Sequence, residues 1–189
     1  MEQFMSVWRN YMKNYMSSET LENAELLPKI MQMENFQRWN DDLTLPQVLC
    51  HGDFTPPNIM FEKDTRTFKS ICDYQTSNIG NGMQDLARLL ATSLSGQNRR
   101  KHTENLLKVY HEEIQKHISY QIDFEKIIES YEIFFVLHSA VCCSTSPGSI
   151  LRRLNESTDE QFKQQISDVM WEKYTLLLED MAIYWNYHF

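Results

Sequence analysis

The stretch Cys50-His51-Gly52-Asp53-Phe54-Thr55-Pro56-Pro57-Asn58, followed after a gap by Asp73-Tyr74-Gln75, decides the fold that the sequence predicts. Apolar residues flanked by turn-forming residues predict three short β-strands, over residues 47–51, 59–61 and 68–73. The two prolines exclude a helix or a central strand from the loop between the first two strands. The polar side chains of this stretch are therefore expected on loops at strand ends, where they can reach into a cleft.

The polar residues of this stretch are of the kinds that phosphoryl transfer requires. A short hairpin is expected to bring Asn58 and Asp73 side by side. An amide oxygen and a carboxylate together suit Mg²⁺, which keeps its other positions for water and phosphate. Asp53, on the preceding loop, can accept a proton from an attacking hydroxyl group. The set predicts phosphate transfer from Mg-ATP to an alcohol.

The pattern HGDxxxxN, followed by a strand that ends in Asp-aromatic-Gln, resembles the catalytic region of the choline kinase and aminoglycoside phosphotransferase group. More closely, the chain resembles the CHK kinase-like family, which includes ecdysteroid-kinase-like proteins and a nematode-type branch. Gly80 and the run Asp85-Leu86-Ala87-Arg88-Leu89-Leu90 extend the similarity, which covers about residues 45–118. The two motifs together are specific, whereas either alone would be a weak signal.

The resemblance implies a role for each polar residue of the motif. Asp53 is expected to be the catalytic base, and Asn58 and Asp73 to bind the cofactors, Mg²⁺ and ATP. His51 belongs to the same catalytic loop. It is expected to hold this loop in place and not to react itself. The implied substrate is a small molecule with a hydroxyl group. Choline, ethanolamine, a steroid alcohol and an aminoglycoside-like sugar all remain open.

Two further residues are expected to give structural support. The resemblance implies that Asp85 caps the following helix and holds the catalytic loop by hydrogen bonds to its backbone. Gln75, together with Tyr74, is expected to support the metal-binding strand. The chain departs from the family at Phe54-Thr55, where a Leu-Trp pair is usual, and this difference alters the expected substrate wall.

Helical periodicity dominates the rest of the sequence. Helices are predicted over residues 3–16, 28–39, 83–94, 100–118 and 124–143, and from near Ser157 onward, with breaks at residues 80–82 and 146–148. The predicted fold class is α+β, predominantly helical: the C-terminal lobe of a protein-kinase-like fold with a small β insert. A single domain over residues 1–189 is expected, with leading helices (1–45), catalytic and metal loops (46–82) and a helical remainder (83–189).

No glycine-rich loop or phosphate-binding lysine precedes the motif, so the N-terminal nucleotide lobe is predicted to be absent. Two functions therefore stay open. The first is an ATP-dependent small-molecule kinase. The alternative is a truncated, inactive kinase-like protein that acts as a binding or regulatory module. An exposed cleft face would then find a partner or self-associate.

Composition excludes several classes of protein. The net charge of −8 is unfavourable for binding nucleic acid or an anionic membrane. No transmembrane segment or signal peptide is predicted, and the four cysteines are expected to be reduced, so the predicted location is cytoplasmic. His111-Glu112-Glu113-Ile114-Gln115 lacks the second histidine of a zinc-protease motif and predicts no metal site.

Overall fold

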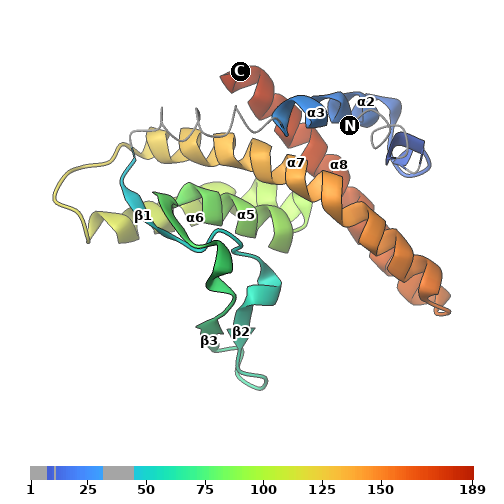
Figure 1. Ribbon diagram of the computed structural model, residues 1–189, viewed down its shortest axis with the longest axis horizontal. Helices are drawn as coiled ribbons and strands as arrows, with labels where there is room; N and C mark the ends of the chain where they lie inside the picture. Colours follow the sequence, from blue (N-terminus) through green and yellow to red (C-terminus); the bar gives the residue numbers. More distant parts are fainter. Residues whose placement is uncertain (1–7, 11, 32–44) are drawn as a thin grey trace.

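The computed structural model describes residues 8–10, 12–31 and 45–189 of the chain. It is mostly helical, with two small antiparallel sheets, in agreement with the predicted α+β class (Figure 1). The predicted helices over residues 3–16 and 28–39 lie partly outside the described residues. Inside them, residues 8–10 are helical, and two short helices follow, α2 (Ser18–Asn23) and α3 (Leu27–Ile30).

Each sheet consists of two strands, and together the sheets hold the motif. Strand β1 (Gln47–Cys50) pairs with β4 (Asn78–Asn81), and β2 (Ile59–Phe61) pairs with β3 (Phe68–Ile71). The three predicted strands are confirmed. The predicted turn over residues 80–82 is wrong in part, because Gly80 and Asn81 end β4. Asn and Gly are poor strand formers, and here the pairing with β1 overrides that preference.

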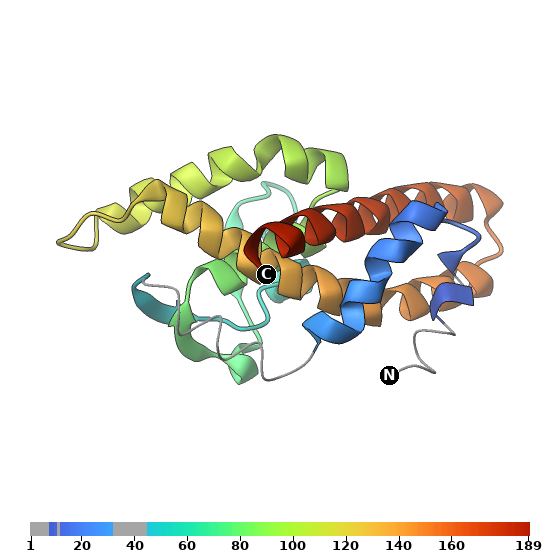
Figure 2. The same ribbon diagram turned by 90° about the horizontal axis from the view of Figure 1, so that it is seen from above.

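Four longer helices form the body of the protein. They are α5 (Met83–Ser93), α6 (Gly96–Gln115), α7 (Phe124–Glu156) and α8 (Glu160–His188). Helix α8 runs back along α7, and α5 packs against α7 on another side (Figure 2). Helix α8 begins after Asp159, whose carboxylate accepts a hydrogen bond from the Phe162 amide, rather than near Ser157 as predicted. Asp123 caps α7 as expected from the sequence.

Helix α7 lies at the centre of the core and supplies much of its apolar surface. Its fully buried residues pack against α5 on one side and α8 on the other. By length and composition, α7 is the one helix of the described residues that could cross a membrane. Half of its most apolar 18-residue window is buried inside the structure, and the core helix of a folded domain passes the same test. The finding is therefore weak evidence for a membrane span.

The predicted break at residues 146–148 is wrong, because α7 continues through Pro147 to Glu156. Proline has no N–H group, so the carbonyl of Cys143, four residues earlier, loses its helical partner. The indole Nε1 of Trp8 donates a hydrogen bond of 2.8 Å to that carbonyl. A residue far away in the sequence thus satisfies the group that would otherwise disfavour a proline inside a helix.

We expect Trp8→Phe to lower the free energy of unfolding by about 1–3 kcal/mol, because it leaves the buried Cys143 carbonyl unsatisfied. In a Pro147→Ala background the new amide at position 147 can donate to this carbonyl, so Trp8→Phe should cost less. Urea unfolding followed by circular dichroism of the two single variants and the double variant measures this coupling. An equal cost of Trp8→Phe in both backgrounds would contradict this account of the helix.

Candidate functional site

The loop that joins β1 to β2 carries three residues of the predicted site, His51, Asp53 and Asn58. Gly52 has a φ of +82°, and a Cβ atom there would lie 2.3 Å from the carbonyl oxygen of Thr76. Only glycine lets the loop adopt this conformation and approach the segment after β3 so closely. The Thr76 and Ser77 hydroxyl groups donate to the His51 carbonyl oxygen over 3.3 and 3.5 Å. The loop is therefore fixed from the side of η3 (Tyr74–Thr76).

Asp85, in the first turn of α5, fixes the same loop from the other side. Its two carboxylate oxygens accept hydrogen bonds from the amides of His51 (2.5 Å) and Gly52 (2.9 Å). The predicted capping role of Asp85 is wrong. The Asn81 side chain accepts from the Met83 amide at the start of α5 instead, because the Asp85 carboxylate is turned toward the loop.

His51 links the loop to the end of β3. The amide of Asp53 can only donate, so its 3.2 Å hydrogen bond requires an unprotonated Nδ1. Nε2 then carries the proton and donates to the carbonyl of Cys72 over 2.9 Å. The buried ring also packs against Tyr74, with ring centroids 4.8 Å apart. Both ring nitrogens therefore make hydrogen bonds to the backbone, so His51 holds the loop against the end of β3.

The carboxylate of Asp53 lies in a network of polar groups. Arg88 of α5 forms an ion pair with its Oδ1 over 2.5 Å, and the amide nitrogen of Asn58 donates to its Oδ2 over 3.2 Å. The same nitrogen donates to the Asp53 carbonyl over 2.9 Å. The structure thus brings Asp53 and Asn58 together. Arg88 was not among the predicted site residues. Residues three apart on a helix share a face, however, and the expected contact of Asp85 with the loop already places that face against the loop.

Asp73 follows β3 directly and has left-handed backbone angles (φ 67°, ψ 60°). The amide of Cys72 donates to the Asn58 carbonyl over 3.0 Å, so the hairpin places Asn58 beside the residue that precedes Asp73. The side chain of Asp73 is exposed and stands outside the Asp53–Arg88 network. Gln75 is also exposed, and among the described residues it contributes no hydrogen bond to the loop.

The predicted magnesium ligands fit a hard cation by the chemistry of their donors. Hydrogen bonds occupy the amide nitrogen of Asn58, which leaves its oxygen as the group that can face a cation. The exposed Asp73 carboxylate is a second hard oxygen donor. Over residues 8–10, 12–31 and 45–189 there is no group of three or more His, Cys, Asp and Glu side chains that could hold a metal. A site of this kind would depend on phosphate oxygens and water for its other ligands.

A hollow of about 400 Å³ adjoins the loop. His51, Phe54 and Asp85 line it together with Tyr110 of α6. Burial raises the pKa of Tyr110 to about 12, so its hydroxyl keeps its proton at neutral pH and can donate a hydrogen bond. This size and this mixture of aromatic and polar groups suit a small ligand.

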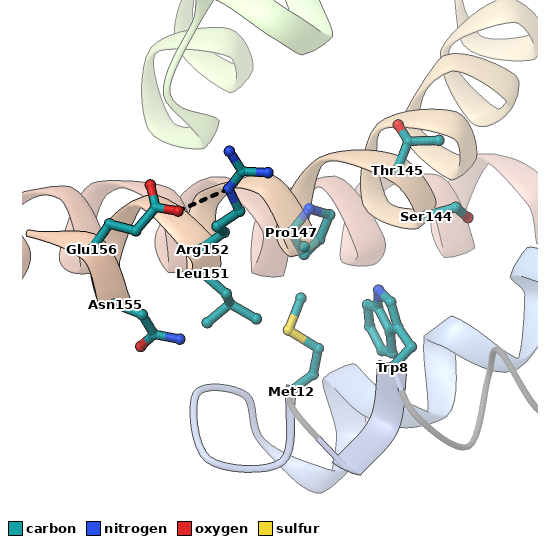
Figure 3. A pocket seen from close by; sticks show the side chains of 10 residues that line it. Trp8, Met12, Ser144, Thr145, Pro147, Leu151, Arg152, Asn155 and Glu156 are labelled. Carbon is teal, nitrogen blue, oxygen red and sulfur yellow. Dashed lines mark hydrogen bonds and ion pairs between the residues drawn. The ribbon is translucent and has the colours of Figure 1, made fainter.

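A second, larger cavity of about 600 Å³ lies away from the motif (Figure 3). Trp8 and Met12 face the C-terminal half of α7 across it, and Pro147 and Leu151 form part of its apolar wall. It shares no lining residue with the hollow beside the catalytic loop. Of the predicted catalytic and metal-binding residues, His51 lines the smaller hollow, whereas Asp53, Asn58 and Asp73 line neither of these two cavities.

Apolar side chains are exposed on both sheets. Leu49 and Ile79 face each other across β1 and β4 and are 71% and 64% exposed. Phe61 and Phe68, on β2 and β3, are also exposed and pack edge to face with their rings 6.4 Å apart. Exposed large apolar residues that cluster in this way commonly mark an interaction surface.

Comparison with known proteins assigns the chain to a family. It belongs to the DUF1679 family, whose model, described as "Uncharacterized oxidoreductase dhs-27", matches residues 1–189. A curated relative, the "Uncharacterized kinase-like protein D1044.1" of Caenorhabditis elegans, is 29% identical over 127 residues. That match covers 62% of this chain and 34% of the relative, so it spans about a third of that protein. No solved structure matches the chain significantly.

We expect Gly52→Ala to lower the free energy of unfolding by about 1–3 kcal/mol, because a side chain at this φ is strained and meets the Thr76 backbone. Gly148→Ala is a matched control: it lies inside α7, and its Cβ atom would meet nothing within 4 Å. That change should stabilise the protein by about 0.5–1 kcal/mol. Thermal unfolding of the two variants measures both effects, and equal effects would contradict the described loop geometry.

Proposed function

We propose that the chain carries the catalytic loop of an ATP-dependent phosphotransferase that acts on a hydroxyl group of a small molecule. The observation that supports this most is the arrangement around Asp53. Its loop is held by Asp85, His51 and Gly52, and its carboxylate is oriented by Arg88 and Asn58. His51 and Phe54 of the same loop line a hollow of small-ligand size. The name of the relative, which describes it as kinase-like, supports the same function.

In this proposal Asp53 accepts the proton of the attacking hydroxyl group. Its Oδ1 is committed to Arg88 at 2.5 Å, whereas Oδ2 makes a longer hydrogen bond of 3.2 Å to Asn58. Oδ2 keeps an unused lone pair and is the better acceptor for a new proton. Asn58 and Asp73 would hold Mg²⁺, which when bound neutralises charge on the phosphates. Holding the hydroxyl and the base in one geometry supplies much of such a rate enhancement.

The described fold gives less support to an oxidoreductase. Dinucleotide-binding units contain parallel strands joined by helices and the pattern G-x-G-x-x-G at a helix start. Both described sheets are antiparallel, and the sequence before α5 is Gly80-Asn81-Gly82-Met83-Gln84-Asp85. Asp85 stands where the third small residue is needed, and its carboxylate would repel a pyrophosphate.

The exposed apolar residues of the two sheets favour a second candidate, an inactive kinase-like module that binds another protein. Leu49 lines the hollow beside the loop and pairs with Ile79 across the sheet, so a partner that binds these two residues would cover part of that hollow. This alternative predicts self-association or capture of a partner, and no nucleotide binding. A cytoplasmic location and the single-domain organisation stay predictions under either function.

Calorimetric titration with Mg-ATP tests the proposal. We expect binding that requires Mg²⁺ and weakens at least about 10-fold in Asp73→Asn, because a metal ligand is lost. Asp64→Asn, at an exposed position in the turn between β2 and β3, is the matched control and should bind as the wild type does. Asp53→Asn should still bind nucleotide but lose transfer.

Nucleotide binding that persists without Mg²⁺, or that is unchanged in Asp73→Asn, would contradict the proposed metal site. No heat at millimolar nucleotide, together with self-association on size-exclusion chromatography, would favour the binding module.

A further inference from the structure

Arg88 connects the candidate base to the interior of the protein. One terminal nitrogen of its guanidinium group contacts Asp53, on the loop. Its Nε atom is buried and has no hydrogen-bond partner among the described residues. A buried N–H group on a charged side chain is normally satisfied. The other end of this guanidinium therefore needs an acceptor inside the protein.

His138 of α7 is the group that can supply the acceptor. Both of its ring nitrogens are buried and without a partner in the described structure, although part of the residue is exposed. Burial and the nearby charge of Arg88 lower the pKa of His138 to about 3. The Gln84 backbone also faces the ring and acts to raise this pKa, because its carbonyl oxygen can accept a hydrogen bond from a protonated ring nitrogen. At neutral pH the ring is uncharged, and one of its nitrogens is an acceptor.

The unpartnered groups lie in the interface between α5 and α7, which pack closely against each other. The Nε–H of Arg88 is a donor that lacks an acceptor, and neutral His138 offers an acceptor that lacks a donor. A direct hydrogen bond, or one internal water molecule between the two, satisfies both groups. The planar guanidinium can do this while it holds Asp53, because its donors point in several fixed directions.

We propose that Arg88 is the positioning residue of the candidate base, and that His138 holds Arg88 in place by accepting its Nε–H, directly or through one water molecule. The inference rests on the proposed function only in treating Asp53 as a base. Asp85 and His51 fix the loop backbone, whereas Arg88 and Asn58 orient the Asp53 carboxylate. Helix α7 is thereby coupled to the reacting atom through Arg88.

A double-mutant cycle on the ¹⁵N-labelled chain tests the coupling without any ligand. The variants are Arg88→Gln, His138→Phe and the double variant, and the readout is the amide signals of Asp53 and Asn58. We expect His138→Phe to shift these signals in the wild-type background and not in the Arg88→Gln background, because Arg88 carries the effect. Equal shifts in both backgrounds, or no shift at all, would overturn the proposal.

Conservative variants separate positioning from general loss of structure. Arg88→Lys should retain the contact with Asp53. In this background His138→Phe should not shift the Asp53 and Asn58 signals, because a lysine has a single charged group and no second donor that could reach His138. His138→Gln retains an acceptor and should shift the Asp53 signal less than His138→Phe; it also serves if the latter variant fails to fold. Arg152→Gln removes an exposed ion pair with Glu156 and should leave the loop signals unchanged.

The double-mutant cycle and the nucleotide titration test different claims, so one can fail while the other holds. A wild-type chain that binds no Mg-ATP refutes the proposed function, and the double-mutant cycle still reports on the positioning of Asp53. Where transfer is detected, Arg88→Gln should lower kcat about 10²-fold with little change in KM, as expected for a misplaced base. A change in KM alone would contradict the positioning role.

Discussion

The hydrogen bonds from the His51 and Gly52 amides to the Asp85 carboxylate are the contact on which the site depends. Two adjacent N–H groups of a loop would otherwise be unsatisfied at a partly buried position, which is costly. One carboxylate satisfies both and ties the loop to the first turn of α5. The consequence is geometric: once Asp85 sets the rotation of α5 against the loop, Arg88 must face Asp53 one turn later. The same contact therefore fixes the backbone and brings the cation to the candidate base.

The sequence was sufficient for the motif strands, because Pro, Gly and alternating apolar residues act locally, and for the contact of Asp85 with the loop. It was insufficient for β4, since Asn78–Asn81 becomes a strand only when β1 is beside it. Asp85 was expected to touch the loop, and it does, but its expected role as a helix cap was wrong because one carboxylate cannot face both ways. Arg88 could have been found from its spacing to Asp85. His138 could not, because only the packing of α7 on α5 brings it near.

The passage of α7 through Pro147 shows how a local rule fails for a physical reason. Proline disfavours a helix interior mainly through a lost N–H and an unpaired carbonyl. The indole of Trp8, which is almost fully buried, lies outside the helix and donates a hydrogen bond to this unpaired carbonyl. The extended helix gives α8 a long surface to pack against, while the same helix also packs against α5. A break at Pro147 would have shortened the surface of α7 against which α8 packs.

The polar site and the exposed apolar strands are adjacent, and this bears on both candidate functions. The hollow beside the loop is lined by His51 and Phe54 on one side and by Leu49 of β1 on another. A surface that covers Leu49 and its cross-strand neighbour Ile79 also covers part of the hollow beside the catalytic loop. In a kinase such a cover completes the catalytic site, and in a binding module it conceals the same residues. The uncovered chain already holds the Asp53 carboxylate in a defined orientation through Arg88 of α5 and Asn58, so in either case the cover meets a site whose geometry is set in advance.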